Sequence, residues 1–306
     1  MEKTWFETSS AFKAQMIGKL LGDGSITLQR GRKPRFNYIH TATDFEWSYY
    51  CYKQLSNFLP LNSPKYKKTE DPRLLQGYSE SYYVQSRTSD IITYLRTKWY
   101  STVGKVIPFD LIVKHFTKES LAWWYMDDGN FKSDGQLARK IILSSESFSG
   151  EENAELVSIL REKFQLNFRR DNQNRILLYD QFQINYFLSL VGTYIHPSMY
   201  RKTINSYQYI FKTSANRTTI YLPKTINIES PTRNINMALK KLPYLISTYK
   251  SGMFYEEYFK SSGGNSGEIE MKSYQIIIKE ENLNNLQLLR AMTGLSYSKI
   301  VVLCFI

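Results

Sequence analysis

Cysteine is scarce in this chain of 306 residues, which has only Cys51 and Cys304, far apart in the sequence. Two distant cysteines exclude a disulfide-stapled scaffold and a cysteine-rich zinc site. Long apolar runs are also lacking, and none approaches the length of a membrane span. The first ten residues, MEKTWFETSS, lack the apolar core of a signal peptide. We therefore expect a protein with no membrane partner, located in a cytoplasm (bacterial or phage) or in an organelle.

The charge balance is one-sided, with 40 Lys and Arg against 28 Asp and Glu and a formal net charge of +12. Basic proteins gain affinity for polyanions by displacing counterions from phosphates. A merely soluble basic surface is the alternative, and charge alone does not decide between the two. Because 42% of the residues are hydrophobic, the chain can fold, and its length permits two or three modules.

Two short segments share one plan, which indicates an internal repeat. MIGKLLGDGSI (16–26) and LAWWYMDDGNF (121–131) are apolar helical runs that end in Asp-Gly. Asp23 and Asp128 occupy equivalent places in them. An acid at the C-terminal end of a helix is disfavoured by the helix dipole, so something nearby must compensate its charge.

The similarity continues downstream of both motifs. Segments 82–108 and 176–204 each predict a strand, then an amphipathic helix, then a loop that ends in a lysine. The lysines are Lys105 and Lys202, and they follow the two acids at similar distances. A doubled unit of about a hundred residues accounts for these matches.

Each copy predicts the same order of elements, α-β-β-α-β-β-α. Apolar residues alternate on either side of Gly-rich and charged loops, which is the pattern of hairpins, in the segments 25–41, 64–87, 130–147 and 165–181. Helices are predicted between the hairpins, over 44–59 and 149–164. The second of these helices begins with Ser149 and has Glu152 three residues later, which predicts a capping box.

The four hairpins are unusually basic. Strand pairs that alternate Arg and Lys with Gln, Asn and Tyr fit a ribbon laid in the major groove of DNA. Solvated sheet edges, where Lys prevents aggregation, are the alternative. Four equivalent hairpins in two copies favour nucleic acid. The candidate DNA-binding residues are Arg30, Arg32, Lys33, Arg35, Lys65, Lys67, Lys68, Arg87, Lys132, Arg139, Lys140, Arg169, Arg170 and Arg175.

One acid per copy predicts a composite site between the two copies. If the two helices pack side by side, Asp23 and Asp128 come together and repel unless a cation lies between them. Oxygen ligands select a hard cation such as Mg²⁺. Such a site polarises a phosphate and activates a water for in-line attack.

IGKLLGDG and LAWWYMDDG resemble the two signature motifs of LAGLIDADG homing endonucleases, in the form with both halves on one chain. The resemblance covers residues 10–205. It implies an α+β fold in which two pseudo-symmetric αββαββα halves form a saddle that grips double-stranded DNA, with a monomeric nuclease core. It also implies Mg²⁺-dependent cleavage of both strands at one long site.

The same resemblance assigns roles by position. It implies that Asp23 and Asp128 bind the metal and are catalytic. It implies that Lys105 and Lys202 polarise the water or the scissile phosphate.

The residues that precede the two acids, Gly22 and Asp127, are further candidates for the metal site. They are counterparts of each other, so Asp127 is not the catalytic acid. Gly18 and Gly22 allow close helix contact, whereas Trp123 and Asp127 stand at those positions in the second copy, and the interface cannot be symmetric.

Two other functions fit the same scaffold. One is an intron maturase, an RNA splicing cofactor, and the other is a catalytically inactive DNA-binding regulator. The presence of both acids and both lysines argues against an inactive site. The chain has no N-terminal Cys or Ser of the splicing type, which favours a free-standing or intron-encoded protein.

Beyond the two halves, over 1–115 and 116–215, the sequence predicts an extension and linker over 216–267 and a small module over 268–306. The segment 260–268 is rich in Gly and Ser, as flexible linkers are.

The last module predicts a strand, an amphipathic helix that Gly294 ends, and a final helix that Ser296 begins. This order resembles the ribbon-helix-helix repressors, which implies that Ser273, Gln275 and Ile277 face DNA. A small helical appendage on the nuclease is the alternative. A lone strand cannot bury itself, so the module implies dimerisation or pairing with another strand.

Overall fold

The computed structural model describes residues 4–134, 137–204, 217–262 and 270–306. The chain forms two compact units. The first unit comprises Met1–Lys132, Lys140–Tyr179 and Phe187–Asn205, and the second comprises Ser133–Arg139, Asp180–Tyr186 and Ser206–Ile306.

The first half of the repeat follows a short 3-10 turn, η1 (Trp5–Glu7). Its elements are α1 (Ser10–Leu21), β1 (Ser25–Thr27), β2 (Arg35–Thr41), η2 (Ala42–Asp44), α2 (Phe45–Leu55), β3 (Lys65–Glu70), β4 (Tyr78–Gln85) and α3 (Asp90–Trp99). The strands form a four-stranded antiparallel sheet of order β1-β2-β4-β3. A small hairpin and a helix lead to the second half: β5 (Tyr100–Ser101), β6 (Gly104–Lys105) and α4 (Phe109–His115).

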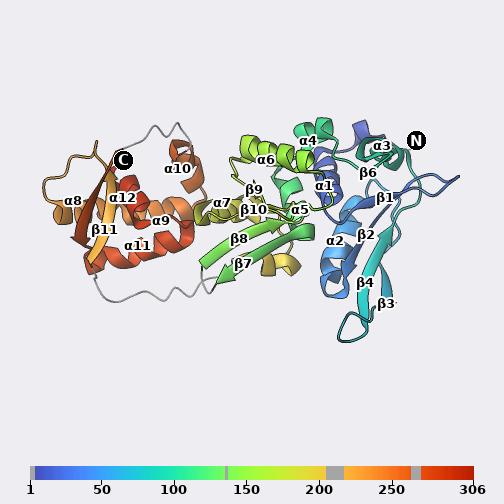
Figure 1. The fold of residues 1–306 in the computed structure, drawn as a ribbon, viewed down its shortest axis with the longest axis horizontal. Coiled ribbons are helices and arrows are strands. Elements are labelled where there is room, and N and C mark those ends of the chain that lie inside the picture. The colour runs from blue at the N-terminus through green and yellow to red at the C-terminus, as the bar shows by residue number, and fades with distance from the viewer. Residues whose placement is uncertain (1–3, 135–136, 205–216, 263–269) are drawn as a thin grey trace. The chain divides into compact units, whose positions relative to one another are not determined.

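The second half repeats this order (Figure 1). Its elements are α5 (Lys118–Asp128), β7 (Gly129–Asp134), β8 (Leu137–Leu143), α6 (Gly150–Phe164), β9 (Arg169–Arg170), β10 (Ile176–Leu178), α7 (Gln181–Gly192) and η3 (Pro197–Lys202). Its sheet has the equivalent order, β7-β8-β10-β9. The predicted α+β class and the doubled αββαββα order are therefore confirmed.

Local signals in the sequence account for several boundaries. The predicted capping box begins α6, because the Ser149 hydroxyl accepts from the Glu152 backbone while the Glu152 carboxylate accepts from the Ser149 backbone at 2.8 Å. Thr117 caps α5 in the same way. In β2, Phe36, Tyr38 and His40 are buried while the residues between them are not, so one face of the sheet packs into the core.

The second unit contains a two-stranded ribbon and a group of helices. Its elements are β11 (Arg217–Pro223), α8 (Pro231–Ala238), η4 (Leu239–Lys241), α9 (Leu242–Lys250), α10 (Phe254–Ser262), β12 (Met271–Ile277), α11 (Glu280–Thr293) and α12 (Tyr297–Phe305). Apolar side chains from both strands and from the helices form one core, in which Ile220, Leu239, Leu245, Leu286 and Ile300 are wholly buried.

In the described ranges, no single helix has the length and apolar character to cross a membrane. Only α11 and α12 taken together, as a bent pair, meet that test of length and composition.

The C-terminal elements belong to one compact unit. The segment 217–262, predicted to be an extension and linker, lies in the same compact unit as the last strand and helices. The reason is that β12 pairs antiparallel with β11 along its whole length. The local predictions for this region are confirmed: Gly294 ends α11 with a φ of 72°, and the Ser296 hydroxyl caps α12. The Gly/Ser-rich residues 263–269 lie outside the described residues.

Candidate active site

The two motif helices, α1 and α5, pack closely against each other because glycine stands where they meet. A Cβ atom placed on Gly18 would lie 2.4 Å from the carbonyl oxygen of Ser120 and 2.6 Å from the Cβ of Trp123. A Cβ placed on Gly22 would lie 2.6 Å from the Cβ of Asp127. Larger side chains would therefore push the helices apart, and the predicted asymmetric contact is what the structure has.

Asp23 and Asp128 lie at the C-terminal ends of these helices and affect each other's charge. The pKa of Asp23 is raised to about 7, mainly by burial and next by the negative charge of Asp127. The pKa of Asp128 is raised to about 8, mainly by burial and next by the negative charges of Asp23 and Asp127. Carboxylates that repel in this way hold a proton near neutral pH unless a cation is close by. Two partly buried carboxylates with unbalanced charge are a donor set that fits a hard divalent cation.

Both predicted lysines lie beside these acids. The Lys105 ammonium donates to the carbonyl oxygen of Gly24 at 2.9 Å. Lys202 donates to three carbonyl oxygens at the end of α5, those of Tyr125, Met126 and Asp127, at 3.3, 2.5 and 3.2 Å. A cation at this end of a helix offsets the negative end of the dipole, which makes the nearby acids tolerable. Burial lowers the pKa of Lys105 to about 8, and burial also lowers the pKa of Lys202.

Asp127 is held in a buried network that the sequence analysis missed. The side chains of Asp127 and Lys19 have no exposed surface, and Lys19 donates to Oδ1 of Asp127 at 2.8 Å. Trp47 Nε1 donates to the same oxygen at 2.9 Å, and the backbone N–H of Asp23 donates to Oδ2 at 3.2 Å. Burial alone would raise the pKa of Asp127, but Lys19 holds it below its usual value. Asp127 is therefore ionised, and the ammonium of Lys19 balances its charge.

Asp23, His40 and Asp127 form a possible metal-binding group, since one ligand atom from each lies within 4.8 Å of the others. The Lys19 ammonium, however, also donates to Nε2 of His40 at 2.7 Å. An ammonium bound to both His40 and Asp127 takes the place that a cation would need and repels it. The Lys19 ammonium therefore disfavours a cation between His40 and Asp127. The geometry favours Asp127 as a buried counter-charge.

One feature of the sequence could have revealed this network. Lys19 is the charged residue inside the apolar run MIGKLLG. A lysine in a buried helix almost always has a partner of opposite charge. Gly22 has a packing role, because its small size admits Asp127.

The exposed face of the first sheet carries several of the predicted DNA-binding residues. Because buried side chains alternate with less buried ones along β2, Arg35 lies on this exposed face. Register places Lys65 beside Tyr83 and Lys67 beside Ser81 in the neighbouring strand, on the same face. Lys68, the next residue along β3, lies on the other face of the sheet. Its ammonium lies 3.6 Å from the ring centre of Tyr78.

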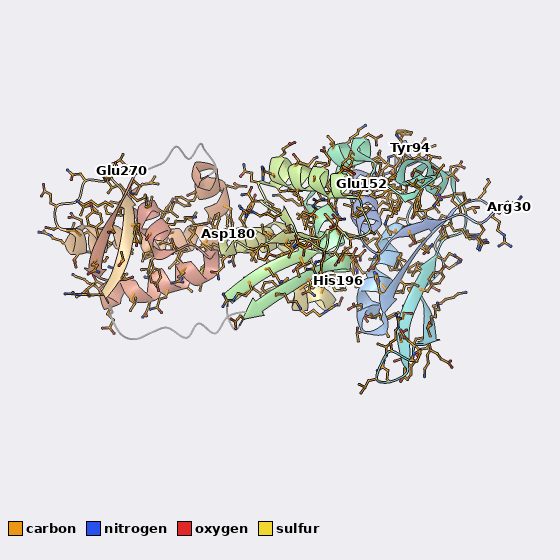
Figure 2. The ribbon with its side chains drawn as sticks, in the orientation of Figure 1. Arg30, Tyr94, Glu152, Asp180, His196 and Glu270 are labelled. Atoms are coloured by element: carbon orange, nitrogen blue, oxygen red, sulfur yellow. The ribbon has the colours of Figure 1, made fainter. Side chains whose placement is uncertain are left out.

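The remaining basic residues of the first half lie outside the strands. Arg30, Arg32 and Lys33 are exposed in the loop between β1 and β2, and Figure 2 shows Arg30 pointing away from the ribbon. Arg87 is exposed directly after β4. Together with Arg35, these residues give the loop end of the sheet a strongly positive surface.

The basic residues of the second half differ in their exposure and in whether they form ion pairs. Lys132 in β7 and Arg169 and Arg170 in β9 are exposed, and Lys140 in β8 is half-buried. Arg139 forms an exposed ion pair with Asp134 at 2.6 Å. Arg175 forms two bonds with Asp171, at 2.7 and 3.0 Å, and so stabilises the turn between β9 and β10.

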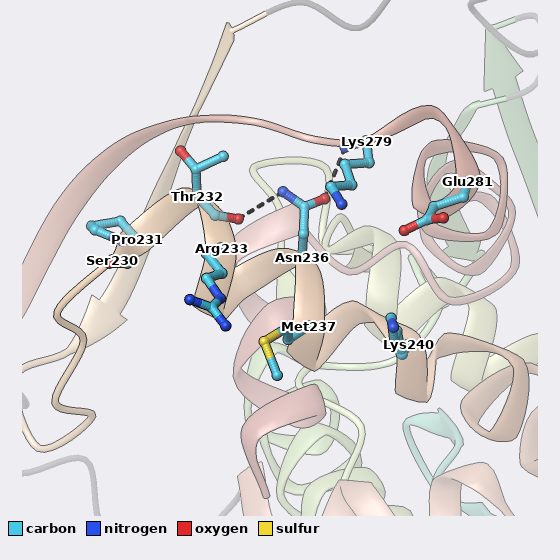
Figure 3. Close-up of a pocket in the computed structure, with 9 residues that line it drawn as sticks. All are labelled: Ser230, Pro231, Thr232, Arg233, Asn236, Met237, Lys240, Lys279 and Glu281. Carbon is cyan, nitrogen blue, oxygen red and sulfur yellow. Dashed lines mark hydrogen bonds between the residues drawn. The ribbon is translucent and has the colours of Figure 1, made fainter.

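The second unit has a surface pocket of about 710 Å³ at the start of α8 (Figure 3). Three cationic side chains and one anionic side chain line it, those of Arg233, Lys240, Lys279 and Glu281. Asn236 lies at its centre, donates to the carbonyl oxygen of Ile277 at 2.9 Å and accepts from the backbone of Lys279 at 2.8 Å. Asn236 therefore joins α8 to the end of β12.

The chain is similar in sequence to two known proteins. A Methanocaldococcus jannaschii protein named as uncharacterized is 29% identical over 202 residues, which cover 63% of this chain and 74% of that protein. A Wickerhamomyces canadensis protein named "Probable intron-encoded endonuclease 1" is 26% identical over 215 residues, 66% of this chain and 88% of its own.

A solved structure of the homing endonuclease I-WcaI bound to its DNA recognition sequence has a similar fold. The TM-score is 0.55 at 22% identity, and the match covers 63% of this chain and 86% of that one. The profile of the LAGLIDADG DNA endonuclease family matches residues 13–186, more than half of the chain, and this match includes both Asp-Gly motifs. The chain belongs to the LAGLIDADG DNA endonuclease family.

Proposed function

We propose that this protein is a site-specific homing endonuclease that makes metal-dependent double-strand breaks in DNA at one long recognition site. The observation that carries the proposal is the pair of repelling carboxylates, Asp23 and Asp128, at the packed ends of α1 and α5, each with a lysine nearby. The family membership of the chain supports the same chemistry.

Asp23 and Asp128 are proposed to bind Mg²⁺. When bound, this ion would polarise the scissile phosphate and lower the pKa of a water. Asp127 positions Asp23 through the bond from the Asp23 backbone to Oδ2. Because Lys19 neutralises Asp127, the network adds no net negative charge beside the two ligands.

Lys105 and Lys202 are proposed to stabilise negative charge on the phosphate as it develops. Both ammonium groups are largely buried, and burial lowers both pKa values. A buried cation stabilises charge more strongly than one in water because the local dielectric constant is lower. The helix-end carbonyl oxygens keep each ammonium in place.

The exposed faces and loops of the two sheets are proposed to bind the DNA. Arg35, Lys65 and Lys67 share one face of the first sheet with the polar side chains of Asn37 and Gln85. Lysine and arginine suit phosphates, whereas Asn and Gln form paired hydrogen bonds with adenine in the major groove. The same division of roles extends to the basic residues of the second sheet.

The decisive experiment is incubation of the full chain with DNA that spans the uninterrupted insertion site, with and without Mg²⁺. We expect cleavage of both strands only with the metal. Asp23→Asn and Asp128→Asn should each abolish cleavage and leave DNA binding largely intact. Asp110→Asn, which removes an exposed acid from α4, is the matched control and should cut normally.

The outcomes also separate the alternatives. An inactive regulator would bind the DNA without cutting it under any condition. A maturase would bind the intron RNA and promote splicing. Normal double-strand cleavage by Asp23→Asn or Asp128→Asn would refute the composite site.

A further inference from the structure

The second unit contains two copies of one arrangement, a strand followed by two helices. In the later copy, β12 precedes α11 and α12. In the earlier copy, β11 precedes a first helical segment, made of α8, η4 and α9, and a second helix, α10. A glycine with positive φ separates the helices in each copy, Gly252 at 81° and Gly294 at 72°. Only the later copy could be predicted from the sequence.

The pairing of the two strands is symmetric. Arg217 pairs with Ile277 at one end of the ribbon and Pro223 pairs with Met271 at the other. The central pair is therefore Ile220 with Tyr274. A seven-residue antiparallel pair of this kind has an approximate two-fold axis through its centre, and each strand leads into its own two helices. The inward side chains of both strands enter one shared core.

This arrangement completes the ribbon within one chain. The last strand could be buried in two ways, by dimerisation or by pairing with another strand. The structure has the second, since β11 supplies the partner. The ribbon therefore needs no second copy of the protein.

The outward face of the ribbon carries no acid, and it is polar in its middle and apolar toward its ends, where Pro223, Met271 and Ile277 lie. The exposed residues alternate with the buried ones and include Thr219, Tyr221, Ser273 and Gln275. The fourteen residues of β11 and β12 contain no Asp or Glu, and the outward face carries one cation, Arg217. Lys272 pairs with Leu222 on the other face, where its ammonium lies 5.3 Å from the ring centre of Tyr274. A face of hydrogen-bonding side chains with positive charge complements a groove of nucleic acid.

We propose that this ribbon enters the major groove of double-stranded DNA and recognises a second sequence segment beside the nuclease target. The major groove is wide enough for a two-stranded ribbon, and Gln, Ser and Thr side chains contact the edges of bases there. The proposal does not depend on the cleavage chemistry, because binding by the ribbon requires neither the acids nor a metal.

Cationic groups lie near one edge and one end of the ribbon. The backbone N–H of Tyr221 donates to the hydroxyl of Ser298 at 3.0 Å, which holds the first turn of α12 and its exposed Lys299 beside β11. At the end where β12 stops, Lys279 and the pocket that it shares with Arg233 supply further positive charge. Backbone phosphates are bound by such groups, which fix the register of the ribbon on the duplex.

The test is a selection of random-sequence duplex DNA by the full-length chain, in a buffer with a metal chelator so that the DNA stays intact. Three proteins are compared: the natural chain, the variant Tyr221→Ala/Gln275→Ala, and the control Tyr244→Ala/Asn284→Ala. The control removes an exposed tyrosine and an exposed amide from α9 and α11 instead of from the ribbon. Circular dichroism verifies that all three fold alike.

We expect two preferred sequence segments from the natural chain and from the control. The ribbon variant should lose one segment, with a fall in affinity for the selected DNA of about tenfold or more. Arg217→Gln should reduce the slope of log affinity against log salt by about 0.9, because Arg217 is the cation on the outward face. Lys250→Gln, on the exposed end of α9, should leave the slope unchanged.

Several outcomes would overturn the proposal. They are a single segment from the natural chain, two segments from the ribbon variant, or preferential binding of RNA by the ribbon face. A concentration-dependent dimer in light scattering that the ribbon variant abolishes would show a protein contact instead. If only the cleavage proposal fails, the ribbon-dependent segment is still selected, so the two failures are distinguishable.

Discussion

The buried ion pair between Lys19 and Asp127 gives a quantitative test of the candidate site. Lys19→Met keeps the length of the side chain and removes its charge, which leaves the Asp127 carboxylate buried without its ammonium partner, beside Trp47 and His40. Loss of one partner from a buried pair costs about 3–5 kcal/mol. No reduction for solvent screening applies, because both side chains are wholly buried. For a unit of this size, the melting temperature should fall by roughly 6–20 °C.

Tryptophan fluorescence is a suitable probe because every tryptophan of the chain lies in the first unit. Trp47 contacts the pair directly through its bond to Asp127. Urea unfolding followed by this signal therefore reports the free energy of unfolding of the unit that holds the pair. A change in the midpoint without a change in the slope would identify a loss of stability alone.

A double-mutant cycle isolates the interaction itself. The variants are Lys19→Met, Asp127→Asn and the two combined, and we expect a coupling free energy of about 1–3 kcal/mol. The matched control is the exposed pair of Lys98 and Asp110, whose atoms are 2.7 Å apart, against 2.8 Å in the buried pair, but whose side chains are 37% and 58% exposed. Its coupling should be about 0.2–1 kcal/mol. Equal coupling in both cycles, or a cost under about 1 kcal/mol for Lys19→Met, would refute the desolvated pair.

Three further predictions follow from the packing and the charges. Lys105→Ala and Lys202→Ala should slow single-turnover cleavage far more than they weaken DNA binding; an equal loss of both, with a lower salt slope, would make them phosphate anchors. Gly18→Val should destabilise the first unit by about 1–3 kcal/mol or more in urea, because the new Cβ meets the Ser120 carbonyl oxygen. Leu286→Ala should cost the second unit about 2–5 kcal/mol, measured by hydrogen exchange of its peptides.

The fold of the first unit could be predicted because its signals are local and occur twice. Ser149 and Glu152 cap a helix through contacts three residues apart. Hairpin arms are adjacent in sequence, and one copy verifies the other. Asp23 and Asp128 could be predicted as a pair for the same reason, since a repeat places equivalent residues around one axis.

The role of Asp127 could not be predicted in this way because its partner is remote. Lys19 lies 108 residues earlier in the chain. Gly22 stands at the equivalent position of the other copy, so the repeat itself contains no counterpart of the acid. A residue that breaks the symmetry of a repeat needs tertiary structure to explain it, and here the explanation is charge balance across the contact of α1 with α5.

The ribbon illustrates a different limit of sequence reasoning. A strand with one apolar face must pair, yet its composition is the same whether the partner comes from another molecule or from the same chain. The cost of closing a loop rises only slowly with its length, so pairing of β12 with β11 within one chain is favourable at any protein concentration. Dimerisation would depend on concentration.

Pairing within one chain also has a consequence for recognition. A ribbon made by two identical chains presents the same residues twice and suits a palindromic site. Here the equivalent outward positions differ, with Thr219 and Tyr221 on one strand and Ser273 and Gln275 on the other. Such a ribbon can recognise two different half-sites. The same reasoning applies to the two halves of the first unit, because a single chain lets each copy diverge. The proposed DNA binding by both units therefore predicts a non-palindromic target.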